Sequence, residues 1–305
     1  MIPVGIDIAK QKIDVFYQNN HHIVENNDKA LRKFFKQLPK ESRIVMEATG
    51  KYHRAAHCVL NELGLKVMLI NPFQSRNFAK AMNVICKTDK VDAKVLALFA
   101  EKMDFVERPS ASETEQEMQE LSRYLEDLKD QKVALLGRKE NATRSIKGSI
   151  ETVIDAINKE MKAIESELEK VARGDKVIAG KMDLLLTIPG VGKSTALLLL
   201  SNLKELGSLS KNRIVALAGV APRNNESGTY MGKRYVRGGR SNIRSALFMP
   251  VLGAATMHND RLQKIYRKLV EHGKCKKVAL IACMRKIVVW ANFMIANNLA
   301  WNPNF

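Results

Sequence analysis

The longest stretch without proline lies between Pro109 and Pro189, and it restricts the possible folds more than any other feature of the chain. Residues 113–171 within it are rich in Glu, Lys, Leu and Ile, so long helices are expected. Apolar residues recur there at alternating spacings of four and three, the period of helices that pack side by side. A coiled-coil hairpin or dimer stalk is therefore predicted, with Gly148 and the polar stretch NATRSIKGS as the candidate bend. The clearest run is Ile150, Ile154, Ile157, Met161, Ile164, Leu168 and Val171.

The residues before this stretch show strand and helix patterns in succession. MIPVGIDIA and KIDVFYQ both alternate as strands do, and they join at Ala9-Lys10-Gln11, which predicts a hairpin. A strand, a helix, a strand, a helix and a further strand follow, and a last helix covers KVDAKVLALFAEKM. The order β-β-β-α-β-α-β predicts one α/β domain over residues 1 to about 105, with the strand order of the ribonuclease-H-like fold.

Four acids in this domain are candidate metal ligands. Asp7 interrupts the apolar first strand, and Glu47 ends the apolar strand RIVM, which lies beside the first in the predicted order. Asp89 and Asp92 are three residues apart and therefore share one face of the last helix. Clustered carboxylates repel each other unless cations hold them, so Mg²⁺ or Mn²⁺ is predicted as the cofactor. Each acid alone also fits a structural position in a turn or in the first turn of a helix.

The formal net charge of +18 indicates a polyanionic partner, because such self-repulsion is costly without one. In residues 112–170 acids outnumber bases, so the positive charge lies elsewhere, mainly in the C-terminal third. Nucleic acid is favoured over an anionic membrane, since no uninterrupted apolar run reaches about 18 residues. A cytoplasmic, nucleoid-associated protein without a membrane partner is expected. The bases of residues 211–244, opposed only by Glu226, are Lys211, Arg213, Arg223, Lys233, Arg234, Arg237, Arg240 and Arg244.

The segment LTIPGVGKSTALLLL contains GVGKST, which partly matches a nucleotide-binding P-loop. A P-loop needs a glycine five residues before its Gly-Lys pair, but Thr187 stands at that place before Gly192 and Lys193. ATP hydrolysis is therefore not expected. Gly190 and Gly192 instead match a helix-hairpin-helix-like turn, whose backbone N–H groups bind nucleic-acid phosphates. An ordinary turn before a helix is the alternative.

The motifs GIDIAK, MEATG and TDKVDAKVLA resemble those of the DEDD transposases of insertion sequences, the IS one-ten family. The resemblance spans nearly the whole chain, and Asp7, Glu47, Asp89 and Asp92 match the four acids of that family. It implies a RuvC-like domain at 1–108, a coiled-coil linker at 109–178 and a mainly helical transposase domain at 179–305. It further implies a transposase or site-specific recombinase that acts on donor and target DNA under the guidance of a bridge RNA. The resemblance also implies a dimer or tetramer whose active site joins two subunits.

A second resemblance, to the C-terminal signature of the same family, lies in NRIVALAGVAPRNNESGTYMGKRYVRGGRSNIRSALF. It implies that Ser227 is a nucleophile that attacks DNA, with Ser241 as the weaker candidate; from the residues alone, Ser227 is a loop serine. Two alternatives remain. One is a RuvC-like Holliday-junction endonuclease that uses activated water, and the other is a non-catalytic nucleic-acid-binding protein. The predicted binding residues are Gly190, Gly192, Lys193, Arg223, Lys233, Arg234, Arg237, Arg240 and Arg244.

Overall fold

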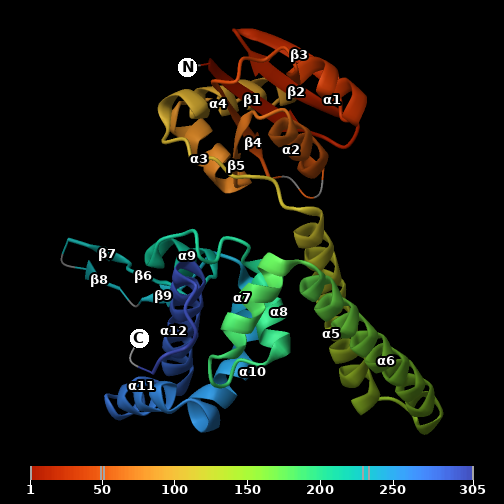
Figure 1. The fold of residues 1–305 in the computed structure, drawn as a ribbon, viewed down its shortest axis with the longest axis vertical. Helices are drawn as coiled ribbons and strands as arrows, with labels where there is room; N and C mark the ends of the chain where they lie inside the picture. The colour runs from red at the N-terminus through yellow and green to blue at the C-terminus, as the bar shows by residue number, and fades with distance from the viewer. Residues whose placement is uncertain (1, 49, 51, 229, 233, 304–305) are drawn as a thin grey trace. The chain divides into compact units, whose positions relative to one another are not determined.

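The chain folds into two compact units, residues 1–112 and 113–305. The computed structural model describes all of it except residues 1, 49, 51, 229, 233 and 304–305. The first unit is a mixed α/β domain, and the second is mainly helical (Figure 1). The long helices after Pro109 belong to the second unit.

The first unit is built on a five-stranded sheet in the order β3-β2-β1-β4-β5. β1, β2 and β3 are antiparallel neighbours, whereas β1, β4 and β5 run parallel. Ile6 pairs with Met46, so Asp7 and Glu47 follow at neighbouring positions of adjacent strands. The order confirms the predicted succession of strands and is compatible with a ribonuclease-H-like domain. The strands are β1 (Ile2–Ile8), β2 (Lys12–Tyr17), β3 (Asn20–Glu25), β4 (Ser42–Glu47) and β5 (Lys66–Ile70).

Helices contribute to two apolar cores of this unit. α1 and α2 pack into one core with Leu31 and Leu60, which meets Val4 and Ile6 of β1. α4 forms the other core through Leu96 and Phe99, and α3 lies beside α4. These helices are α1 (Asp28–Phe35), α2 (His53–Glu62), α3 (Pro72–Ala81) and α4 (Asp89–Lys102).

The second unit begins with a helical hairpin formed by α5 (Glu113–Glu140) and α6 (Arg144–Gly174), which pack along each other. Ile150 and Ile154 are buried, as their spacing predicts. The bend lies at residues 141–143, the first residues of the predicted NATRSIKGS stretch, whereas Gly148 itself lies within α6. A single glycine costs only about 1 kcal/mol in a helix, and good helix formers on both sides carry α6 through it.

The rest of the second unit packs around α12 and carries a small β-ribbon between α9 and α10 (Figure 1). In the ribbon, β6 pairs with β9 and β7 pairs with β8. The helices are α7 (Lys176–Leu186), α8 (Lys193–Asn202), α9 (Lys211–Leu217), α10 (Ser241–Gly253), the π-helix η1 (Ala254–His258), α11 (Asp260–Glu271) and α12 (Lys276–Asn297). The ribbon strands are β6 (Pro222–Arg223), β7 (Glu226–Ser227), β8 (Tyr230–Met231) and β9 (Tyr235–Val236).

Within the described part of the chain, α12 is the one helix that is long and apolar enough to cross a membrane by length and composition. Arg285 and Lys286 interrupt its apolar sequence, which is why no continuous run stands out. Ile287, Val288 and Met294 are buried in the core of the second unit. The helix is apolar because it forms the centre of a packed domain.

Candidate active site

Two strand ends and one helix start bring the four predicted acids into the same region of the first unit. Asp7 lies near the end of β1, and Glu47 ends β4. Asp89 and Asp92 occupy the first turn of α4. α4 packs on β1, with further contacts to β2 and β4. The acids therefore come from three elements that touch one another.

The close approach of α4 to β1 depends on Gly5. A Cβ atom there would lie 2.0 Å from the carbonyl oxygen of Ala93 and 2.3 Å from the amide nitrogen of Ala97. Any other residue would push the helix away from the strand. Thr88 begins the helix, since its hydroxyl accepts a hydrogen bond from the amide of Val91. Gly5 thus sets the distance between Asp7 and the α4 acids, a role that the strand pattern alone does not reveal.

The four carboxylates lie close enough to repel one another. Burial raises the pKa of Asp7 to about 6, and Asp92, Asp89 and Glu47 contribute to the rise through their negative charges. Burial also raises the pKa of Asp92, although two nearby cations oppose the effect. Burial and mutual repulsion therefore both disfavour the ionised form of Asp7 in this site.

Two further groups orient the acids. The Ser75 hydroxyl on α3 donates a hydrogen bond of 2.9 Å to Oε2 of Glu47, and Ser75 is buried. The amide of Ile8 donates to Oδ1 of Asp7 at 3.0 Å. Ser75 is absent from the residues that the sequence predicts, because nothing in its own segment links it to a strand that ends 28 positions earlier. The structure alone makes the link.

Carboxylate oxygens of this kind suit Mg²⁺ or Mn²⁺. Among the described residues, no three Asp, Glu, His or Cys side chains already converge as a metal site. The donor chemistry and the mutual repulsion fit a divalent cation, whose arrival would draw the carboxylates together. The residues that would hold it are Asp7, Glu47, Asp89 and Asp92.

Replacement of Asp7 by Asn is expected to stabilise the metal-free protein at pH 8. The pKa of Asp7 in the folded protein is about 6 and its usual value is 3.8, so the folded state binds this proton more tightly. Stability therefore falls as pH rises from about 4 to 6, and the cost persists above that range. Since the group is partly exposed, the expected gain for Asn is about 1–2 kcal/mol.

Urea unfolding in a chelator at pH 8 and pH 4 measures this effect. The gain should be present at pH 8 and should disappear at pH 4, where Asp7 is already protonated. An Asp7→Asn protein that is less stable than wild type at both pH values would contradict the proposed cost of the buried Asp7 charge beside the other acids.

Ser227 lies in the β-ribbon of the second unit, in β7, and is exposed. It pairs with Tyr230 across a turn in which Gly228 has a φ of +55°. A Cβ on Gly228 would meet open space, so the backbone of Gly228 is accessible. Ser241 is exposed as well, but it begins α10. Accessibility therefore does not choose between the two serines.

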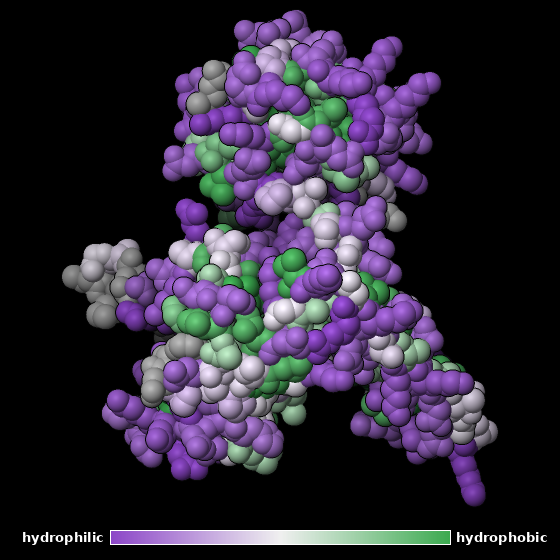
Figure 2. Space-filling model, viewed as in Figure 1, coloured by the Kyte–Doolittle hydropathy of each residue, from purple (hydrophilic) through white to green (hydrophobic). Residues whose placement is uncertain are grey.

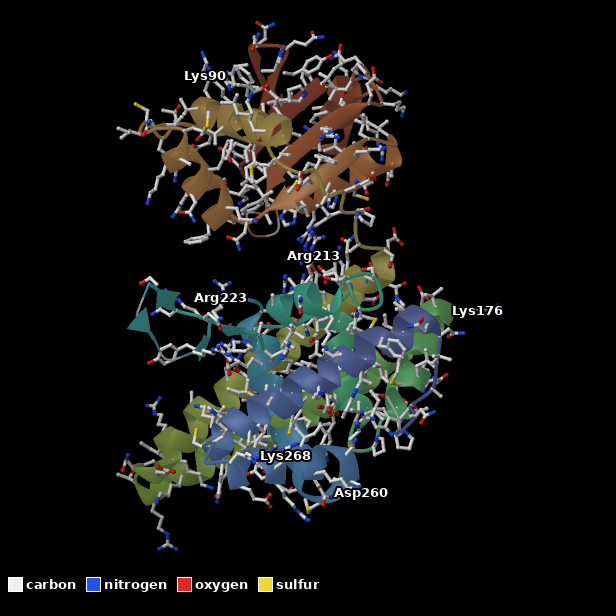
Figure 3. All side chains as sticks on the ribbon, turned by 90° about the vertical axis from the view of Figure 1, so that its left-hand side faces the viewer. Lys90, Lys176, Arg213, Arg223, Asp260 and Lys268 are labelled. Carbon is white, nitrogen blue, oxygen red and sulfur yellow. The ribbon has the colours of Figure 1, made fainter. Side chains whose placement is uncertain are left out.

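Exposed cations are spread over several elements of the second unit. Arg223, Arg234 and Arg237 are exposed on the ribbon segment, and Arg213 and Lys268 are exposed on α9 and α11 (Figure 3). Hydrophilic residues also dominate much of the surface in Figure 2. Lys233 lies outside the described residues.

Two of the predicted phosphate-binding arginines have partners inside the second unit. Both terminal nitrogens of Arg240 donate to Glu205 at 2.7 Å, and Glu205 is largely buried. The Arg244 guanidinium donates to the carbonyl oxygen of Gly219 at 2.8 Å. These contacts hold α10 to the neighbouring loops, so a phosphate would have to compete with them.

The turn between α7 and α8 contains the predicted glycines. Gly190 has a φ of +86°, and a Cβ on it would lie 2.5 Å from Cβ of Ala254, so the turn packs tightly against η1. Gly192 begins α8 and faces open space. The Lys193 ammonium pairs with Glu169 of α6 at 2.7 Å. Gly190 is thus explained by packing, whereas Gly192 leaves the start of α8 accessible.

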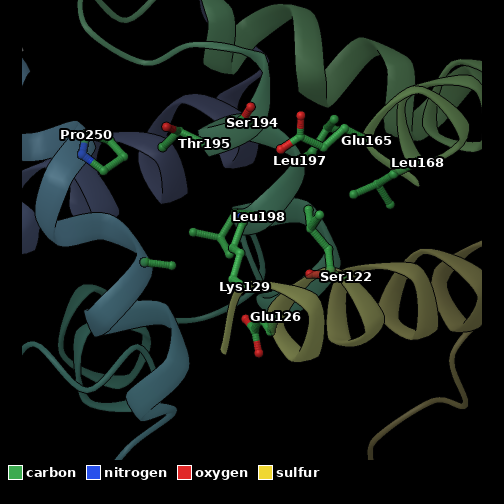
Figure 4. Close-up of a pocket in the computed structure, with 12 residues that line it drawn as sticks. Ser122, Glu126, Lys129, Glu165, Leu168, Ser194, Thr195, Leu197, Leu198 and Pro250 are labelled. Carbon is green, nitrogen blue, oxygen red and sulfur yellow. The ribbon is translucent and has the colours of Figure 1, made fainter. Parts of the chain in front are cut away.

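A cavity of about 270 Å³ lies among α5, α6, α8 and α10 (Figure 4). Leucines such as Leu168 and Leu197 line it together with Glu126, Lys129 and Glu165. None of the predicted site residues is among its lining residues. The cavity therefore has no lining residue in common with the predicted site.

A five-stranded sheet with two acids near its strand ends and two at the start of α4, in a chain with a basic helical unit, fits an enzyme that acts on polynucleotides. Sequence comparison makes the class more specific. A model of transposases of the DEDD type matches residues 4–146, and a model described as "Transposase IS116/IS110/IS902 family" matches residues 182–267. The chain belongs to this transposase family, and it is an enzyme of DNA recombination and transposition.

Curated relatives agree with the family models. The chain is 28% identical to the "Pilin gene-inverting protein" of Moraxella bovis, over 97% of this chain and 96% of that protein. It is 27% identical to the protein of the same name from Moraxella lacunata over the same shares. The likeness thus extends through both units.

Proposed function

We propose that the chain cuts and joins DNA with a divalent-metal site in the first unit and a serine nucleophile in the second. The observation that carries the proposal is the set of four acids on β1, β4 and α4. Burial raises the pKa of Asp7 to about 6, and the negative charges of the other three acids add to that rise. Acids that repel one another at two strand ends and a helix start are the expected state of a metal site without its metal.

In this proposal the four acids hold the metal ions, and neighbouring groups orient two of them. Asp7, Glu47, Asp89 and Asp92 hold the ions, and Ser75 and the Ile8 amide keep two of the carboxylates oriented. When bound, the ions would stabilise charge on the attacking and leaving oxygens of a phosphodiester.

Ser227 is the proposed nucleophile. A serine hydroxyl is a weak nucleophile, so it needs a base or a metal ion, and cations must offset the charge that develops on phosphorus. Arg223 and Arg237 on the same ribbon segment are exposed and supply such cations. The acidic site supplies the activation, from the same subunit or from a second one.

The α5–α6 hairpin is the proposed oligomer contact. It exposes apolar side chains that a single chain leaves uncovered, and a second copy that packs there as a coiled coil would bury them. A dimer or tetramer would then combine the acids of one subunit with the serine of another. The exposed residues are Val133, Leu136, Ile146 and Val153.

Donor and target DNA are the proposed substrates, and a structured bridge RNA is the proposed guide. The basic second unit supports a nucleic-acid partner without distinguishing RNA from DNA. Gene inversion, which the name of the Moraxella relatives describes, is a DNA recombination of the same general kind. We place the protein in the cytoplasm, at the nucleoid.

A recombination assay tests this function. The full-length protein is purified, the RNA that co-purifies with it is sequenced, and the complex is incubated with two marked plasmids. Rearranged plasmid joints should form only with Mg²⁺ or Mn²⁺ and with the bound RNA. Cut plasmids without new joints would favour the junction endonuclease, and intact plasmids that still bind the protein would favour a non-catalytic binder.

The affinity for nucleic acid should fall steeply as the salt concentration rises. Phosphate contacts of the ribbon arginines should account for part of this fall. The double change Arg234→Gln and Arg237→Gln is expected to reduce the slope of log K against log salt by about 2, since each lost phosphate contact on duplex DNA removes about 0.9. Arg240 is left intact because its loss would strand Glu205 without its partner.

Fluorescence anisotropy with a labelled duplex at several salt concentrations measures this slope. Lys147→Gln with Lys162→Gln is the matched control, because it removes the same charge from exposed positions on α6. Equal losses of slope in both double variants would reject the ribbon as the binding surface.

A further inference from the structure

A lysine that the sequence does not single out reaches the acids from β2. The Lys12 ammonium lies 3.1 Å from Oδ2 of Asp89 and 3.2 Å from Oδ2 of Asp14. Asp14 pairs directly with Asp7 in the β1–β2 register, so the two residues share a face of the sheet. Lys12 therefore bridges one of the four site acids to a fifth carboxylate beside them.

The two partners of Lys12 differ in how firmly they are held. The side chain of Asp14 is 4% exposed, and its Oδ1 is 2.7 Å from Nε2 of His21 on β3. The side chain of Asp89 is 57% exposed on the first turn of α4. Lys12 thus has a fixed partner in Asp14 and an exchangeable partner in Asp89.

The bridge has an electrostatic reason. A lysine side chain is charged at neutral pH, and the Lys12 ammonium contacts Asp89 and Asp14 at the same time. A cation at this position reduces the repulsion among the acids. A divalent ion that binds Asp89 needs the same carboxylate that Lys12 now holds. The ammonium and the metal therefore compete for Asp89.

We propose that Lys12 is the internal counter-ion of the metal-free acidic site and sets the metal concentration at which that site fills. When metal takes Asp89, Lys12 gives up this partner and stays on Asp14. Lys12 is then a positioning residue, which acts on the reaction through Asp89. The inference rests on the metal site under the proposed function.

Mn²⁺ binding to the full-length protein without nucleic acid tests the inference by titration calorimetry. Lys12→Met should bind Mn²⁺ about three- to tenfold more tightly than wild type, the range expected when an ion pair of about 1 kcal/mol and a nearby positive charge are removed. Lys12→Arg keeps the charge and should stay within about threefold of wild type. Circular dichroism melting verifies that each variant is folded.

Lys10→Met is the matched control. Lys10 is exposed in the turn between β1 and β2, so this variant removes the same charge without touching Asp89. Its Mn²⁺ affinity should equal that of wild type. Equal affinities in wild type, Lys12→Met and Lys10→Met would overturn the role of Lys12 and leave the metal site standing. Equal gains in both Met variants would also overturn it, because net charge alone would then explain them. If neither wild type nor any variant bound Mn²⁺, the proposed metal site would be rejected, and the proposed role of Lys12 would be rejected with it.

Discussion

Asp7→Asn, Glu47→Gln, Asp89→Asn and Asp92→Asn are each expected to reduce DNA cleavage and strand transfer by at least about 10²–10³-fold. Each change removes a charged metal ligand and keeps the size of the side chain. Folding should survive, because removal of one of several repelling charges does not weaken the core that Gly5 and α4 form. Binding to DNA should also survive, since the exposed cations belong mainly to the second unit.

The measurement is the yield of recombined plasmid with Mg²⁺ and bound RNA, together with a separate DNA-binding assay. Glu41→Gln and Asp104→Asn are matched controls, because both acids are exposed in the first unit. Their activity should equal that of wild type. Normal recombination in all four site variants would rule out the metal site, and a parallel loss of binding and activity would point to a structural role for the acids.

The strands of the sheet were predictable because each one is identified by the pattern of a few consecutive residues. Apolar alternation along β1 and β2 identifies two strands, and the buried run RIVM identifies β4. Since parallel neighbours end at the same edge of a sheet, Asp7 and Glu47 follow at adjacent positions once the order is known. Asp89 and Asp92 are three residues apart, so their position on one face of a helix is also predictable from a short segment of sequence.

The supports of the site were not predictable, because they join segments far apart in the chain. Ser75 meets Glu47 and Lys12 meets Asp89 only after α3, α4 and β2 are packed. In the sequence, Arg240 looks like its basic neighbours, yet it pairs with Glu205, 35 positions earlier. A count of charges cannot tell an arginine that faces solvent from one with a buried partner.

Ser227 is expected to form a covalent phosphoserine link to DNA, and Ser227→Ala is expected to abolish it. In this step the Ser227 hydroxyl oxygen attacks a phosphorus atom, a serine–phosphate ester forms, and the bond to one deoxyribose oxygen breaks. The proton of the serine leaves with the activating group, and the departing oxygen is protonated or held by a cation. One ester replaces another, so strands can later be rejoined without ATP, in keeping with the missing P-loop glycine at Thr187.

A denaturing gel of protein incubated with labelled DNA, bound RNA and Mg²⁺ detects the link as a shifted protein–DNA band. Wild type and Ser241→Ala should give the band, whereas Ser227→Ala should bind DNA normally and give none. Ser241 is the right comparison because it is also an exposed serine, and it begins α10. A band that persists in Ser227→Ala and vanishes in Ser241→Ala would move the nucleophile to Ser241. Cut DNA without a band in any of the three proteins would mean that water attacks, because a hydroxyl of the chain cannot displace a DNA strand without remaining attached to the phosphate.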